Sequence, residues 1–229
     1  RLEAADFFRH QMHGLAHAHG SIDDLCRQVF EDLRQRITYR DQLFKDETVI
    51  VFSPHPDDDV ISMGGMLDKV VRNGNDVTVA YMTNGSVAVF DADVRRFLRF
   101  IEMSGETLGI DDGADSSFGQ KRDEILRFFD EKNPGAVDTK AVQQLKAHVR
   151  YGEAIAAIEV MGLGEESARF LVMPFYKTGR VRKDAIGPDD VEVVYDLLSE
   201  LQPDHVFVAG DLSDPHGTHR MCYKAIKEA

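Results

Sequence analysis

Four short apolar stretches divide the chain, each followed by polar residues, and they cover residues 48–53, 76–82, 169–173 and 205–209. Their length and their content of valine and phenylalanine predict buried strands. Between them, apolar residues recur at three- and four-residue spacing. This spacing predicts helices at residues 62–73, 139–161 and 191–201, and two more between residues 92 and 138. Strands separated by helices are typical of an α/β fold, a mostly parallel sheet with helices on both faces.

The first 46 residues predict helices only. Ser21 and Asp24 have the spacing of a capping box, and the apolar residues that follow line one face of a helix; they are Ile22, Leu25, Val29, Leu33 and Ile37. We therefore expect a helical lead-in or connection over residues 1–46 and a main domain over residues 47–229. Because the sequence starts at Arg1 and stops within a helical pattern, we also expect it to be a piece of a longer chain.

Composition and charge narrow the functional classes. The chain has 229 residues, 43% of them hydrophobic, which is enough to bury the core of one α/β domain with an appendage. Its net charge of −13 argues against nucleic acid or an anionic membrane surface as a partner. Two cysteines without a C-x-x-C motif indicate a reducing compartment, so we expect a cytoplasmic protein. No apolar run reaches the roughly 18 residues of a membrane span.

Histidines and acids gather directly after two of the predicted strands. The motif P-H-P-D-D-D occupies residues 54–59, and D-P-H-G-T-H occupies residues 214–219. Ligands bind at the carboxyl ends of the strands in an open parallel sheet, so the two clusters should meet at one edge. Imidazole and carboxylate groups together predict an assembled metal site.

A catalytic zinc ion needs three protein ligands and one open position. His55 and Asp58 can reach one ion from a single turn, and His219 can supply the third ligand. Asp57 is then left as a general base, and His216 as a group that stabilises an oxyanion or protonates a leaving amine. This set suits hydrolysis of an amide or ester, with one Zn²⁺ as the expected cofactor. Iron or manganese stays open, because the same ligands suit them.

Two loops at the same edge offer contacts to a substrate. Asn84 and Ser86 follow the second strand and can touch substrate hydroxyls, although small polar residues are also normal in such a loop. A basic group lies in the loop after the third strand, formed by Lys177, Arg180, Arg182 and Lys183. It can bind an anionic substrate group or simply be a solvated loop.

The strand, the P-H-P-D-D-D motif, the glycines that follow it and the later H-x-x-H resemble the zinc deacetylases of the PIG-L/LmbE family over residues 47–229. The resemblance implies a Rossmann-like sheet and removal of the N-acetyl group of an N-acetylglucosamine-type amino sugar by zinc-bound water. The resemblance also implies metal-ligand roles for His55, Asp58 and His219. It implies the role of base for Asp57 and the role of oxyanion stabiliser or acid for His216. Asp59 stands where the family usually has glutamate, so we expect altered support around the ligands rather than loss of activity.

Other parts of the sequence extend this resemblance. Arg150 and Glu153 resemble a pair that shapes the sugar pocket in the family. The segments M-T-N-G-S-V-A-V and G-D-L-S-D-P-H-G-T-H-R resemble a subgroup in which the domain follows a glucosamine-6-phosphate deaminase-like domain, implying a fused or associated partner. The alternatives are a non-catalytic sugar-binding or regulatory domain, and a phosphoesterase, which generally needs two metals and more ligands. The oligomeric state is left open, a homo-oligomer included.

Overall fold

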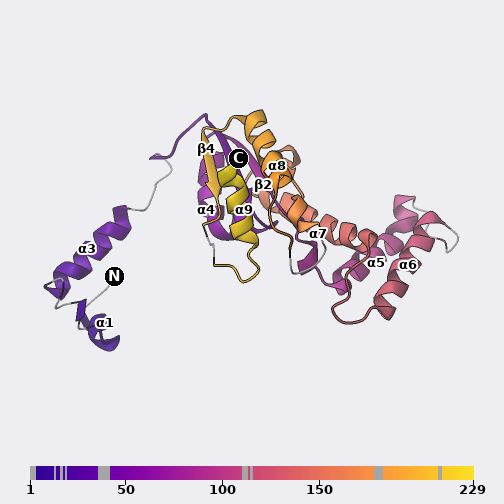
Figure 1. Ribbon diagram of the computed structural model, residues 1–229, viewed down its shortest axis with the longest axis horizontal. Coiled ribbons are helices and arrows are strands. Elements are labelled where there is room, and N and C mark those ends of the chain that lie inside the picture. Colours follow the sequence, from indigo (N-terminus) through magenta and orange to yellow (C-terminus); the bar gives the residue numbers. More distant parts are fainter. Residues whose placement is uncertain are drawn as a thin grey trace. The chain divides into compact units, whose positions relative to one another are not determined.

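The computed structural model describes residues 4–12, 14–15, 18, 20–35, 42–109, 113, 116–177, 183–210 and 213–229. The chain divides into two compact units, residues 1–44 and 45–229. In the first unit, helix α1 covers Ala4–Arg9 and helix α3 covers Ile22–Gln35 (Figure 1). Helix α3 begins directly after Ser21, where the capping pattern predicts it, whereas Ile37 lies outside the described residues.

The second unit holds all four described strands. They are β1 (Thr48–Ser53), β2 (Asp76–Tyr81), β3 (Ala168–Phe170) and β4 (His205–Val208). The helices are α4 (Asp58–Arg72), α5 (Asp91–Leu108), α6 (Ser117–Glu131), α7 (Lys140–Glu159), α8 (Pro188–Leu201) and α9 (Thr218–Glu228). Short 3₁₀ turns cover Ser86–Ala88, Glu165–Ser167 and Pro174–Tyr176. None of the described helices combines the length and the apolar character that crossing a membrane requires.

The four strands form one parallel sheet in the order β3-β2-β1-β4. Strand β1 lies in the interior, with Val49 beside Val77 of β2 and His205 of β4. The predicted α/β class is therefore confirmed. Because all strands point the same way, the residues that follow β1, β2 and β4 reach the same edge of the sheet.

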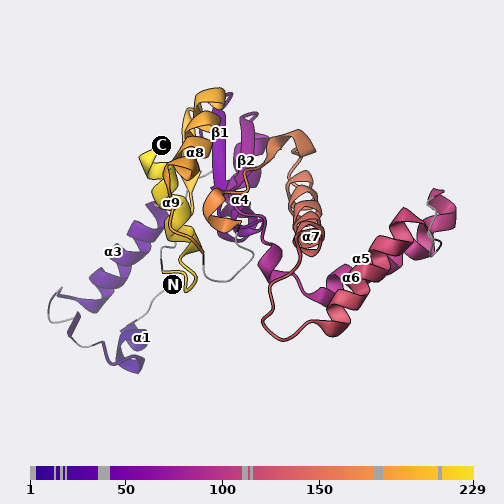
Figure 2. The ribbon, with the colours of Figure 1, turned by 45° about the vertical axis from the view of Figure 1, so that its right-hand side comes forward.

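Each face of the sheet is covered by helices (Figures 1 and 2). On one face, Ile50 and Phe52 join a buried cluster with side chains of α8 and α9; these are Val194, Leu197, Cys222 and Ala225. Alternation along a strand turns Val49 and Val51 to the other face, and helix α4 packs against β1 and β2. This explains why the β1 sequence is apolar at four consecutive positions.

Several boundaries differ from the prediction; helix α8, for example, begins at Pro188 rather than at residue 191. Helix α4 begins at Asp58 rather than at residue 62, because the acids of the motif form its first turn, and it is interrupted at Met63 (φ −143°, ψ 17°). Strand β3 ends at Phe170 rather than at 173. The N–H groups of Leu171 and Met173 still donate to the carbonyls of Tyr81 and Met82, but the left-handed backbone of Val172 (φ 47°) makes this pairing irregular. Helix α9 begins at Thr218 and so contains His219, the second histidine of the H-x-x-H motif.

A buried ion network joins the start of α5 to the body of α7. The Lys146 ammonium lies 2.7 Å from Asp91 Oδ1 and 2.8 Å from Asp138 Oδ2, and Lys132 binds the same two carboxylates. Lys146 is only 4% exposed. Burial alone would raise the pKa of Asp91, but hydrogen bonds from Lys146 and Lys132 outweigh burial and lower that pKa. The network thus joins the start of α5 to the stretch from Lys132 to Lys146, which lies 41 to 55 residues further along the chain.

We expect Lys146→Met to lower the free energy of unfolding by about 3 kcal/mol, because the substitution leaves two partly buried carboxylates with one cation between them. Urea unfolding monitored by circular dichroism measures the loss. Lys227→Met, at an exposed position of α9, is the matched control and should change stability by less than about 0.5 kcal/mol. Equal stability of the two variants would contradict the structural role of the network.

Candidate active site

The two motifs meet at the carboxyl edge of the sheet. His55 Nδ1 lies 3.0 Å from Asp58 Oδ2, and His219 Nε2 lies 3.2 Å from that oxygen and 3.3 Å from His55 Nδ1. Two atoms bound at about 2.1 Å to one tetrahedral zinc ion are separated by about 3.4 Å. The three atoms therefore have the spacing of one face of a zinc coordination shell, and the residues fit the expected metal.

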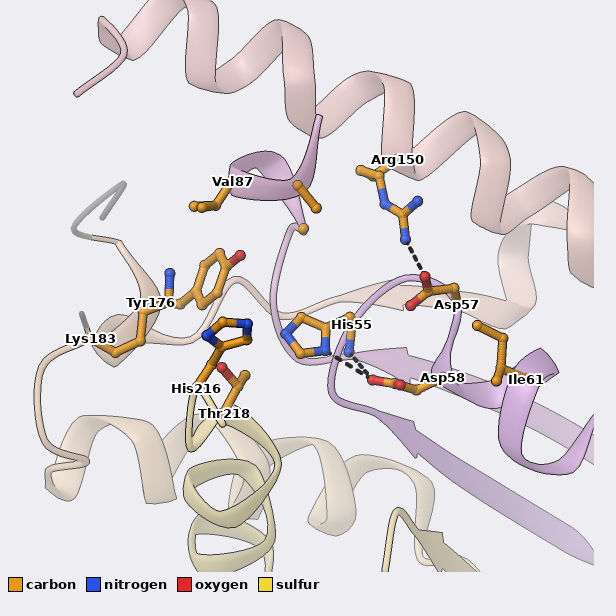
Figure 3. A pocket seen from close by; sticks show the side chains of 12 residues that line it. His55, Asp57, Asp58, Ile61, Val87, Arg150, Tyr176, Lys183, His216 and Thr218 are labelled. Atoms are coloured by element: carbon orange, nitrogen blue, oxygen red, sulfur yellow. Dashed lines mark hydrogen bonds and ion pairs between the residues drawn. The ribbon is translucent and has the colours of Figure 1, made fainter. Parts of the chain in front are cut away.

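The local sequence explains how the segment directly after β1 positions His55 and Asp58. After Ser53, the backbone turns through the two prolines of the motif, and the N–H of His55 donates to Asp58 Oδ2 at 2.8 Å. Burial alone would raise the pKa of Asp58, but hydrogen bonds from the His55 side chain and backbone outweigh burial and lower it. The carboxylate is thus held ionised and oriented, as a metal ligand must be (Figure 3).

The third ligand comes from the start of α9. Gly217 has a left-handed backbone (φ 70°), which glycine adopts without strain, and it ends the loop directly before the helix. The N–H of Thr218 donates to Asp214 Oδ2 at 2.9 Å, so an aspartate satisfies a free donor at the helix start. This turn places His219 in the first helical turn, with its ring next to that of His55 at a centroid distance of 5.3 Å.

Asp57 lies beside the three ligand residues and has a different partner. Its Oδ2 lies 2.9 Å from Nη2 of Arg150 (Figure 3). Nη1 of Arg150 lies 3.0 Å from Glu153 Oε2. The Asp57 side chain is still 44% exposed, so water and substrate can reach it. Gly85 allows this arrangement, because a Cβ there would lie only 3.0 Å from Pro56 and 3.1 Å from the Arg150 guanidinium.

A cavity of about 510 Å³ opens over this group, a size that suits a small-molecule ligand. His216 lines it between Tyr176 and His55, as Figure 3 shows. The remaining lining residues are Asp57, Asp58, Ile61, Gly85, Val87, Ala88, Arg150, Lys183 and Thr218. The structure thus brings the proposed base and the proposed acid to the same cavity as two of the three ligands.

Asp59 supports the loop that carries His55 and is 3% exposed. Tyr81 Oη donates to Asp59 Oδ2 at 3.1 Å, and the backbone N–H of Asp59 donates to Ser53 Oγ at 3.0 Å. The Ser53 hydroxyl in turn donates to the carbonyl of His55. Burial raises the pKa of Asp59, although these hydrogen bonds act in the opposite direction. A carboxylate one methylene shorter than glutamate therefore still connects β1, β2 and the loop.

Of the remaining residues predicted to bind substrate, those that the structure describes do not line this cavity. Asn84 and Lys177 line a separate cavity, Glu153 contacts Arg150 from the outer side, and Arg180 lies outside the described residues. Their roles stay predictions. Sequence reasoning missed Tyr176, which lines both cavities. Its place in the loop just past the third strand, at the edge where ligands bind, was the available signal.

Comparison with known proteins agrees with this geometry. Residues 50–229 match the PIG-L family, described as GlcNAc-PI de-N-acetylase. The chain belongs to the PIG-L family. The chain is 38% identical over 240 residues to a putative glucosamine-6-phosphate deaminase-like protein of Bacteroides thetaiotaomicron, an alignment that covers 99% of this chain and 36% of that protein.

A second relative carries an activity in its name. The PIG-L domain is 29% identical over 126 residues to the diacetylchitobiose deacetylase of Thermococcus kodakarensis, over 48% of this chain and 47% of that protein. The chain thus spans about a third to a half of the length of these two relatives. The family expected from the motifs is confirmed, and deacetylase activity is supported as the general function.

Proposed function

We propose that this PIG-L domain is a zinc-dependent N-deacetylase that acts on an N-acetylglucosamine-type amino sugar. The observation that carries the proposal is the convergence of His55, Asp58 and His219 at the edge of a cavity that also exposes a carboxylate, Asp57. Three ligand atoms within 4.8 Å of one another leave room in a tetrahedral shell for one more group. That arrangement is the one a hydrolytic metal site requires.

The chain's own residues supply the remaining chemistry. When bound by the three ligands, zinc would act as a Lewis acid that acidifies water and polarises the acyl carbonyl. Asp57 accepts the proton of the attacking water, and its ion pair with Arg150 holds the carboxylate in one orientation. His216, on the opposite wall, donates a hydrogen bond to the developing oxyanion or a proton to the leaving amine. Acetate and a free amine are the products.

We also propose a partner domain for this PIG-L domain. The relative from B. thetaiotaomicron is named as deaminase-like, and the alignment to this chain covers only 36% of it. This supports a fused or associated sugar-phosphate deaminase-like domain as the partner of the deacetylase. Acetyl removal would then generate a free amino sugar next to a domain that handles amino sugars.

The test is release of acetate from N-acetylglucosamine and N,N′-diacetylchitobiose by the zinc-loaded protein. We expect one acetate for each free amine formed, loss of turnover after chelation, and recovery on adding zinc back. Binding of these sugars without acetate release by the zinc-loaded protein would instead favour the non-catalytic alternative. Release of phosphate from phosphate monoesters, together with two bound metals, would favour the phosphoesterase.

A further inference from the structure

Residues 54–59, here called the ligand segment, carry two of the three candidate metal ligands (Figure 3). Three buried hydroxyl groups form hydrogen bonds to this segment. They belong to Ser53, Tyr81 and Thr83, whose exposed fractions are 0%, 0% and 1%. None of the three is among the described residues that line the active-site cavity. Any effect of these hydroxyls on the reaction therefore passes through the ligand segment.

Thr83 holds the carbonyl that directly precedes His55. Its Oγ1 donates to the Pro54 carbonyl at 2.7 Å, and its backbone N–H donates to the same oxygen at 3.1 Å. The N–H of Met82 donates to the Ser53 carbonyl at 2.9 Å, so the pairing of β2 with β1 continues into the ligand segment. The Thr83 hydroxyl thus adds a second donor to the carbonyl at which this pairing ends.

Ser53 and Tyr81 hold the ligand segment on either side of Asp58. The Ser53 hydroxyl donates to the carbonyl of His55 and accepts the N–H of Asp59 at 3.0 Å. Tyr81 Oη donates to Asp59 Oδ2 at 3.1 Å. Together with the bonds to the preceding carbonyl, these contacts fix the backbone before and after the Asp58 carboxylate.

The burial of the three hydroxyls gives these bonds their weight. A hydroxyl shielded from water is unfavourable unless it is hydrogen-bonded, so each of the three groups favours the one backbone conformation that satisfies it. A segment that is already ordered loses little conformational freedom when its ligands bind an ion. The same bonds that satisfy the hydroxyls therefore also favour metal binding.

We propose that Thr83, Tyr81 and Ser53 are positioning residues that fix the ligand segment in its metal-binding shape, so that they raise the affinity for Zn²⁺ without contributing a ligand atom. This inference deepens the proposed function and rests on it for the identity of the metal. Groups that orient metal ligands through hydrogen bonds typically change metal affinity by about 10- to 100-fold.

The first test measures the Kd of the metal-free protein for Zn²⁺ by competition with a chromophoric chelator. Thr83→Val keeps the shape of the side chain and removes the hydroxyl, and we expect it to raise this Kd by about 10- to 100-fold. Thr83→Ser restores the hydroxyl and should bring the Kd back close to the wild-type value. Thr78→Val, on β2 but turned to the opposite face of the sheet from Tyr81, is the matched control and should leave the Kd unchanged.

Tyr81→Phe is a second, independent variant, because it removes the hydroxyl that binds Asp59 and keeps the ring. We expect it to raise the Kd for Zn²⁺ as well. Circular dichroism at the temperature of the titration establishes that each variant is folded, so that a general loss of stability does not move the Kd. An unchanged Kd in folded Thr83→Val and Tyr81→Phe overturns the proposal, and so does a Thr83→Ser protein that binds zinc as weakly as Thr83→Val.

The zinc titration needs no substrate, and this separates the inference from the proposed reaction. If both hydroxyl-deficient variants bind zinc more weakly but the wild type releases no acetate from any amino sugar, the positioning role stands and the deacetylase function fails. If the wild type releases acetate and all variants bind zinc equally well, the reaction stands and the positioning role fails.

Discussion

Asp57→Asn should lower kcat for acetate release by about 10²- to 10⁴-fold, the usual contribution of a general base, while zinc stays bound. An amide of nearly the same shape cannot accept the proton of the attacking water. Asp57 is not one of the three residues whose ligand atoms cluster, and its partner is Arg150. The loss should therefore fall on turnover rather than on metal content.

The measurement pairs initial rates with zinc content by elemental analysis on the same preparation. Asp68→Asn, on the same helix α4 but paired with Arg72, is the matched control and should keep full activity. Unchanged kcat in Asp57→Asn would remove Asp57 from the role of base. Loss of zinc in that variant would instead make Asp57 a ligand.

Asp58→Ala should reduce bound zinc from about one ion per chain to near zero and abolish acetate release. The Asp58 carboxylate lies within 3.2 Å of both histidine ligand atoms and is the only anionic member of the cluster. Without it, two neutral imidazoles face each other at 3.3 Å and bind a dication poorly. The variant loses a ligand and its charge together.

Zinc content per chain, measured after purification without added metal, checks this expectation against Asp68→Ala as control. Circular dichroism should show that Asp58→Ala keeps its helical content, since the side chain contacts the site and not the core clusters. Retention of one zinc in Asp58→Ala would mean that the cluster is not the metal site. Two zinc ions in the wild type would point to the phosphoesterase alternative.

Local pattern was sufficient for the elements and for the family. The apolar run at β1 and the helical spacing of α3 follow from periodicity, because side-chain burial alternates with the geometry of strand and helix. The motif at residues 54–59 directly follows β1, so its place at the edge of the sheet could also be predicted from the sequence. Element ends were less predictable: Val172 ends β3 through its backbone conformation, which residue type does not reveal.

The substrate side of the site was the least predictable part. Asn84 and Lys177 lie past the correct strands, yet they line the neighbouring cavity rather than the one over the ligands. Tyr176 and Gly85 shape the catalytic cavity through packing against Lys183 and Arg150. Such contacts depend on how loops from several strands close over one another, and no spacing rule encodes that closure.

The sequence by itself determined the strands, the helices and the family, because these depend on neighbours within a few residues. The tertiary structure decided that His55 and His219, 164 residues apart, lie 3.3 Å from each other. It did so by pairing β4 with β1, a choice made by burial of apolar faces across the whole sheet. It also placed the Lys183 ammonium 3.8 Å from the centre of the Tyr176 ring, and both side chains line the cavity that His55 and Asp58 line.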